Sequence, residues 1–104
     1  MRIFGLKNCD TCRKVLKLIP NAQLVDVRSD GLPSEVLDAA LAKFGEKLVN
    51  TRSTTWRSLD QEARDQSPSE LIARYPALMK RPLIEAEGAL FLGWTLETRA
   101  ALGV

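Results

Sequence analysis

Both cysteines of this 104-residue chain fall within four positions, in a CDTC motif at residues 9–12. A short apolar stretch at residues 3–6 precedes the motif, and residues 10–19 follow with helical apolar spacing. Residues three apart on a helix are surface neighbours, so the two thiols are expected within disulfide reach. Cys9 then stands at a helix N-terminus, where the dipole and unpaired backbone N–H groups stabilise a thiolate.

A CxxC motif between a strand and a helix is typical of a thioredoxin-like redox site. Cys12 shares a helix face with Val15, Leu16 and Ile19, whereas Cys9 lies at the helix mouth. We therefore predict that Cys9 attacks and Cys12 resolves. Three alternatives stay open. They are a structural disulfide, which would constrain the unfolded chain little, a zinc site, for which the chain lacks histidine and further cysteine, and two inert cysteines.

The order of elements predicts the fold class. Strands are expected at residues 3–6 and 23–27, and a hairpin at residues 83–85 and 89–92 around Glu87-Gly88, with a last helix at 96–102. We predict an α/β, thioredoxin-like fold in which a helical insertion separates a βαβ half from a ββα half. The whole chain, residues 1–104, is expected to form a single domain.

The insertion is expected at about residues 33–76. One amphipathic helix begins at Pro33 or Ser34 and stops at Gly45. Short helices are expected at residues 59–65 and from Pro68 to just before Pro76, while residues 51–55 are polar and lack a helical period.

Composition sets the class of protein. Hydrophobic residues make up 45% and charged residues 27%, which is ordinary for a globular domain. No apolar run has the length of a membrane span and no signal peptide is visible, so we expect a cytoplasmic protein without membrane contact. A net charge of +2 without a dense basic block argues against direct nucleic-acid binding. No metal, flavin or nicotinamide site is visible, and no bound cofactor is expected.

Two segments outside the CxxC motif carry candidate binding residues. Residues 50–57 form a polar stretch with Arg52, which could hold an oxyanion or could lie in a solvated loop. Arg81 and Pro82 precede the hairpin, at the place where a thioredoxin-like skeleton often carries a cis proline facing the CxxC. Arg81 would then lower the thiol pKa and attract an anionic substrate; a surface arginine beside a trans proline is the alternative.

Four segments in their order and spacing resemble the arsenate reductase-related (ArsC) family, in its Spx/YffB-like branch. They are residues 7–14 (KNCDTCRK), 50–57 (NTRSTTWR), 75–84 (YPALMKRPLI) and 92–94 (LGW). The resemblance spans nearly the whole chain and implies a thioredoxin-like fold with a helical insertion. It also implies that Cys9 is the reactive thiol and that Arg52 and Arg81 lie near it.

The resemblance separates three functions. Arsenate reductases of the family carry a third arginine, whose equivalent place in this chain is at or near Gly93, and a histidine just before the cysteine, whereas this chain has no histidine. We therefore expect a thiol–disulfide or glutathione-dependent oxidoreductase rather than a true arsenate reductase. Glutathione, or another small thiol or anionic substrate, is the implied partner. The alternative is an Spx-type redox-switched regulator; glutaredoxin and RNA polymerase are the candidate protein partners.

Overall fold

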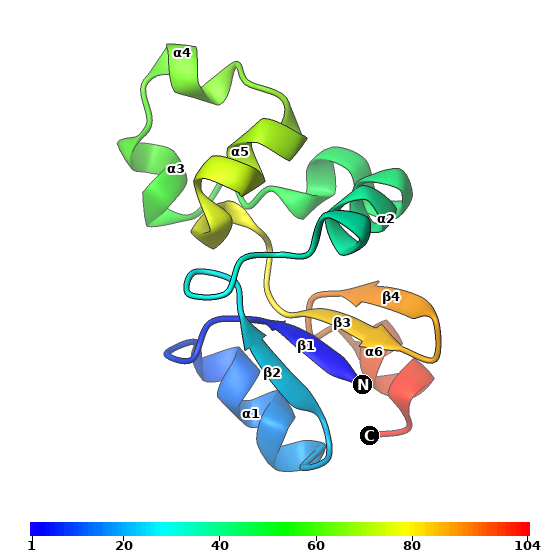
Figure 1. The fold of residues 1–104 in the computed structure, drawn as a ribbon. Coiled ribbons are helices and arrows are strands. Elements are labelled where there is room, and N and C mark those ends of the chain that lie inside the picture. The colour runs from blue at the N-terminus through cyan, green and yellow to red at the C-terminus, as the bar shows by residue number, and fades with distance from the viewer. The chain divides into compact units, whose positions relative to one another are not determined.

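A four-stranded mixed sheet organises one of the two units into which the chain divides. The computed structural model describes all residues, 1–104 (Figure 1). Met1–Asp30 and Arg81–Val104 together form the first unit, here called the sheet unit. Gly31–Lys80 form the second, here called the helical unit. The single-domain interpretation of the whole chain stays a prediction.

The N-terminal half of the sheet unit is a βαβ element. Strand β1 (Arg2–Gly5) leads into helix α1 (Asp10–Leu18), and strand β2 (Gln23–Asp26) returns parallel to β1, with Ile3 opposite Leu24. Helix α1 ends before Pro20, because a proline inside the helix would remove a backbone donor and clash with the preceding turn. This parallel pairing confirms the predicted strand–helix–strand start.

The C-terminal half supplies a hairpin and a helix. Strands β3 (Leu83–Ala86) and β4 (Ala89–Leu92) are antiparallel, and helix α6 (Leu96–Leu102) follows. The turn residues Glu87 and Gly88 have φ of 50° and 79°, as a two-residue hairpin turn requires. Strand β3 pairs antiparallel with β1, which gives the order β2-β1-β3-β4. The predicted thioredoxin-like skeleton is confirmed.

One buried cluster of the sheet unit lies on the face of the sheet that carries Ile3 and Ile84. Ile3 and Ile84 are directly opposite each other on β1 and β3, and both are fully buried with Val15 of α1. Partly buried side chains from both helices and the sheet pack against this cluster: Leu16, Ile19, Ala22, Leu24, Phe91, Trp94 and Leu102. Helices α1 and α6 therefore cover the same face of the sheet, and this fixes the position of the CxxC motif.

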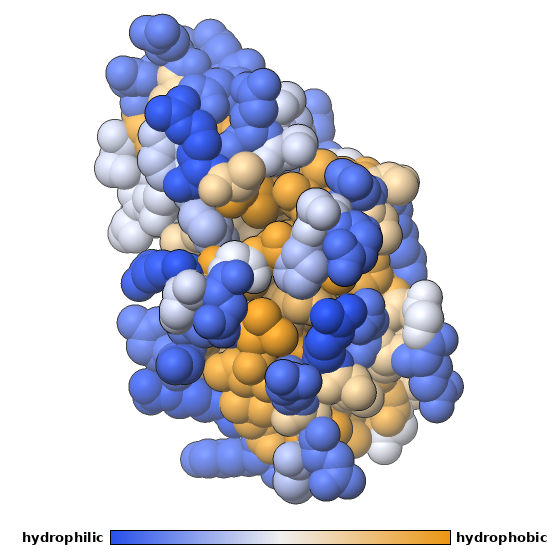
Figure 2. Space-filling model, viewed as in Figure 1, coloured by the Kyte–Doolittle hydropathy of each residue, from blue (hydrophilic) through white to orange (hydrophobic).

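The helical unit consists of short elements. They are α2 (Ser34–Phe44), the 3-10 helix η1 (Gly45–Leu48), α3 (Thr54–Ser58), α4 (Gln61–Arg64), α5 (Pro68–Arg74) and the 3-10 helix η2 (Pro76–Leu78). An isolated antiparallel bridge between Val49 and Met79 joins the residues before α3 to those after η2. Helices α3 and α4 bury no residue, and in Figure 2 the surface around α4 is mostly blue, whereas the surface around α3 is paler, of intermediate hydropathy.

Helix α3 was not predicted. Its N-terminus depends on Ser53, whose hydroxyl oxygen accepts a hydrogen bond from the backbone N–H of Trp56 at 3.1 Å. A five-residue helix without an apolar face leaves no periodic signal in the sequence, so only its cap could have indicated it. The expected helix at residues 59–65 forms over the shorter span of α4.

Candidate active site

Cys9 is the residue on which helix α1 begins. It is the N-cap, with extended backbone angles (φ −89°, ψ 122°), and its carbonyl oxygen accepts the first helical hydrogen bond from the N–H of Arg13 at 3.0 Å. The Cys9 N–H donates to the Leu6 carbonyl oxygen at 3.1 Å. Cys9 is half-buried. The thiol is thus held at the exposed mouth of the helix, as predicted from its place in the motif.

Cys12 lies one turn further on and is fully buried. It shares the inward stripe of α1 with Val15, as its spacing predicted. Its Sγ atom occupies the space beside Gly5 at the end of β1, where a Cβ atom would collide with the sulfur. Glycine at position 5 therefore lets the helix bring the second thiol against the strand.

The pKa values of the two thiols are shifted in opposite directions. Burial would raise the pKa of Cys9, but hydrogen bonds from the Cys12 backbone N–H and thiol, the charge of Arg81 and the Thr11 backbone N–H together lower it below its ordinary value. Burial is also the main reason that the pKa of Cys12 is raised to about 11, and the neighbouring Cys9 raises it further. The outer thiol is therefore the more acidic of the two and forms the thiolate first, while the inner thiol keeps its proton at neutral pH.

Arg81 and Pro82 belong to the same unit as the thiols. The Arg81–Pro82 peptide bond is cis, as predicted, and Pro82 is buried. The Pro82 carbonyl oxygen accepts a hydrogen bond from the Gly93 N–H at 2.8 Å, which ties this loop to the end of β4. The positive charge of Arg81 favours the thiolate form of both cysteines. It helps to lower the pKa of Cys9, and it offsets a small part of the rise in the pKa of Cys12. This cation is therefore close enough to the thiol pair to act on it.

Asp26, at the end of β2, is a positioning residue that sequence reasoning missed. The residue is only 7% exposed. Oδ2 accepts a hydrogen bond from the Lys7 N–H at 3.0 Å, and Oδ1 accepts from the N–H groups of Arg28 and Ser29 at 2.9 and 3.1 Å. These donors lower the pKa of Asp26. One carboxylate thus fixes the loop that leads into Cys9.

Arg52 lies in the helical unit. Its backbone N–H donates to Oδ1 of Asn50 at 3.0 Å, and the residue is exposed. It lines a hollow of about 300 Å³ with Val49, Asn50, Thr51 and Lys80. Backbone hydrogen bonds between residues 48–50 and 78–80 create this arrangement. Lys80 is a second cation beside Arg52 that sequence reasoning missed. The expectation that Arg52 lies near Cys9 stays a prediction.

The sheet unit therefore combines an acidic outer thiol, a protonated inner thiol and a cation. Such a pair can exchange with disulfides, because the thiolate is the attacking species and a second thiol can displace it. No group of three or more His, Cys, Asp or Glu residues is placed to hold a metal ion. None of the helices combines the length and hydropathy of a membrane span.

The model of one protein family, described as the ArsC family, matches residues 4–102. The chain belongs to the ArsC family. The family and the fold support a thiol-dependent, reductase-like class for this ArsC-family protein.

Individual relatives agree over almost the full length of this ArsC-family chain. A protein of uncharacterised function from Haemophilus influenzae is 39% identical, over 88% of this chain and 89% of its own. The structure of the YffB protein (PA3664) is similar at 27% identity with a TM-score of 0.84, covering 96% of both chains. The structure of an arsenate reductase (ArsC) related protein from Brucella melitensis is similar at 30% identity with a TM-score of 0.71, covering 99% of this chain and 94% of that one.

Proposed function

We propose that this protein is a thiol–disulfide or glutathione-dependent oxidoreductase in which Cys9 attacks and Cys12 resolves. The observation that carries the proposal is the divided acidity of two thiols three residues apart: a lowered pKa at the helix mouth and a raised pKa beneath it. The cytoplasm, with its reducing thiol pool, is the compartment in which this chemistry fits.

The reaction begins at Cys9. Its thiolate attacks one sulfur of a disulfide, a Cys9–substrate bond forms, and the other substrate sulfur leaves as a thiolate that takes a proton from solvent. Arg81 contributes positive charge beside the reacting sulfur. Arg52 is the candidate to hold an anionic group of the substrate, such as a glutathione carboxylate, because it is exposed in the polar loop.

The second step belongs to Cys12. Its pKa is raised first by burial and then by Cys9 itself, through a hydrogen bond and a negative charge. Once Cys9 is bound in a mixed disulfide it carries no charge, so both contributions from Cys9 disappear and Cys12 loses its proton more easily. The Cys12 sulfur then attacks Sγ of Cys9, and the second substrate thiolate leaves. Two glutathione molecules restore the dithiol and are themselves oxidised to glutathione disulfide.

Arsenate is the alternative substrate that the names of the ArsC-related neighbours suggest. Position 93 offers no third cation here, because Gly93 has φ of 81°, in the region that favours glycine. The chain also has no histidine to stand before Cys9. We therefore expect weak or no arsenate reduction, and turnover of arsenate that Cys9→Ser abolishes would contradict this expectation.

The test is turnover of a glutathione mixed disulfide, coupled to glutathione reductase and NADPH. The wild-type protein should turn over many equivalents, Cys9→Ser none, and Arg52→Gln should raise KM more than the matched Arg57→Gln on the exposed face of α3. A redox-switched regulator would instead show no turnover. It would recover polymerase subunits from extract in a redox-dependent way without trapped thiol partners, and that result would overturn the proposal.

A further inference from the structure

A hollow in the sheet unit lies between helices α1 and α6, and neither cysteine lines it. Its volume is about 400 Å³, and it is lined by Lys14, Lys17 and Leu18 of α1, Trp94 after β4, and Arg99 of α6. Lys14, Lys17 and Leu18 are exposed on the outer side of α1, away from the buried stripe of Cys12 and Val15.

The lining of this hollow is cationic and has no internal counterion. Three of its five residues are lysine or arginine and none is acidic. Neither Lys14, Lys17 nor Arg99 takes part in an ion pair; the salt bridges near these elements join Arg2 to Glu85 and Arg13 to Asp10. Like charges gathered without a partner repel one another, so a bound anion would stabilise this arrangement.

Arg99 supplies a hydrogen-bonding group that the chain does not use. Its guanidinium lies over the ring of Trp94, with Cζ 5.8 Å from the ring centroid. Its Nε atom is buried and has no hydrogen-bond partner. Buried charged donors are normally satisfied, and a guanidinium offers five N–H groups in a fork that matches carboxylate or phosphate oxygens. The indole, packed on the core cluster, holds this fork in place.

We propose that this hollow binds a small anion, a carboxylate or phosphate carried next to an apolar group. The cations of Lys14, Lys17 and Arg99 would hold the charged group. Leu18, which is 51% exposed, and the half-buried Trp94 would contact the apolar part. A volume of about 400 Å³ lies within the range of small-molecule sites.

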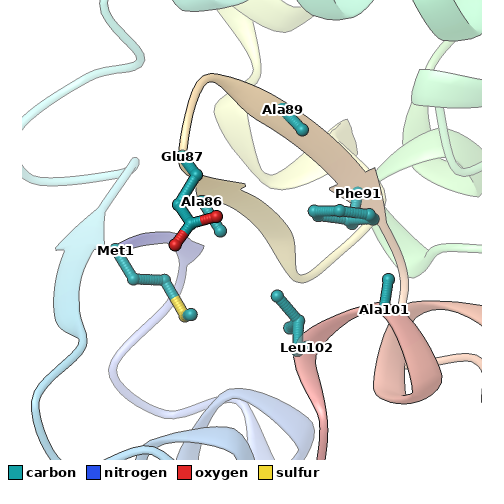
Figure 3. Close-up of a pocket in the computed structure, with 7 residues that line it drawn as sticks. All are labelled: Met1, Ala86, Glu87, Ala89, Phe91, Ala101 and Leu102. Atoms are coloured by element: carbon teal, nitrogen blue, oxygen red, sulfur yellow. The ribbon is translucent and has the colours of Figure 1, made fainter.

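This site is distinct from another hollow of the sheet unit, shown in Figure 3. That hollow lies at the Met1 end of β1, where Phe91 and Leu102 line it and Glu87 is the single charged side chain. It lacks the convergent cations that recognise an anion. The α1–α6 hollow, unlike this one, combines a charge surplus, an unpartnered guanidinium nitrogen and apolar surface.

The hollow also neighbours the proposed redox loop along the chain. Trp94 follows Gly93, whose N–H donates to the carbonyl oxygen of Pro82. An anion held against Trp94 would therefore contact the segment that anchors the Arg81–Pro82 loop. The binding claim itself does not depend on the proposed oxidoreductase function, because none of the lining residues acts in the thiol exchange.

The test uses ¹H–¹⁵N NMR titration of the full chain with three probes that share one ring: phenyl phosphate, phenylacetate and benzyl alcohol. Both anions should shift the indole N–H of Trp94 and the Nε–H of Arg99, and should leave the indole of Trp56 in the helical unit unchanged. The neutral alcohol should bind at least about tenfold more weakly. The two anionic probes distinguish a phosphate ligand from a carboxylate ligand.

Charge reversal provides the control. Lys14→Glu should weaken binding of the anionic probes by at least about tenfold, whereas Lys47→Glu, the same charge change on an exposed residue of η1, should leave it within about twofold. Equal shifts at Trp56 and Trp94, equal binding of the alcohol, or equal effects of the two variants would overturn the proposal. Retained chemical shifts elsewhere show that each variant is folded.

Discussion

Replacing Gly5 with alanine is expected to destabilise the protein, because strand β1 and the inner thiol are packed closely together at this position. A Cβ atom at position 5 would collide with Sγ of Cys12, and the next contacts, with Cβ of Cys12 at 3.6 Å and Cδ1 of Leu24 at 4.0 Å, are ordinary. The conflict is therefore with one sulfur atom. Cys12 is fully buried on a helix, so its side chain has few other rotamers into which to move.

The magnitude follows from two opposed effects. Overpacking a buried site costs about 1–3 kcal/mol. Gly5 does not have a positive φ, so alanine can adopt its backbone conformation and should gain about 0.4–1 kcal/mol by restricting the unfolded chain. We expect Gly5→Ala to destabilise the wild-type protein by about 0.5–2 kcal/mol net. In a Cys12→Ala background the sulfur is gone, and the same change should be neutral or stabilising.

The assay is a double-mutant cycle by urea unfolding under reducing conditions, with the wild type, the two single variants and the double variant. A coupling free energy of about 1–3 kcal/mol between positions 5 and 12 is expected, since the residues are in direct contact. The same cost for Gly5→Ala in both backgrounds would refute the reasoning. It would show that the sulfur does not fill the space left by the glycine.

Three further predictions concern the site. Because the pKa of Cys12 is about 11 and that of Cys9 lies below 9.0, alkylation at pH 8 should label Cys9 at least about a hundredfold faster, and equal rates would contradict the assignment. Arg81→Gln should raise the pKa of Cys9 measured by alkylation, and Arg81→Lys should restore it; an unchanged profile in Arg81→Gln would remove Arg81 from the site. Asp26→Asn replaces one of the two acceptor oxygens, which together bind the N–H groups of Lys7, Arg28 and Ser29, with an NH2 donor, and should cost about 1–3 kcal/mol of unfolding free energy at pH 7. The folded pKa of Asp26 is below its ordinary 3.8, so this contribution should be complete above that value and lost as the pH falls through the native pKa; a pH-independent difference would argue against the carboxylate.

The sheet unit was predictable because its signals are local. Each signal determines the structure of only a few neighbouring residues. These signals are the CxxC motif, Pro20 after α1, and Glu87-Gly88 between the hairpin strands. Strand β1 nevertheless runs from Arg2 to Gly5 instead of residues 3–6. Arg2 enters the sheet because it pairs with Gln23 and with Glu85, to which its guanidinium also forms a salt bridge at 2.7 Å. These cross-strand partners are distant in sequence, so apolar patterning could not fix the strand ends.

The missed parts of the site have non-local causes. Asp26 accepts backbone hydrogen bonds from residues 7, 28 and 29, and the donor that matters for Cys9 is 19 positions away. A carboxylate between the apolar residues Val25 and Val27 was its only sequence signal. Lys80 and Arg52 line the same hollow because the bridge between Val49 and Met79 brings their segments together. No periodic pattern in the sequence predicts this bridge.

The most direct test of the central claim is intact-mass analysis after the reduced protein meets one equivalent of glutathione disulfide. Cys12→Ser should keep one glutathione on Cys9 as a stable adduct, whereas the wild-type protein should pass to an intramolecular Cys9–Cys12 disulfide and release both glutathiones. Cys9→Ser should form little adduct at neutral pH. A glutathione adduct that persists in the wild-type protein, or one that forms equally well in Cys9→Ser, would contradict the assignment of Cys9 as nucleophile and Cys12 as resolving thiol.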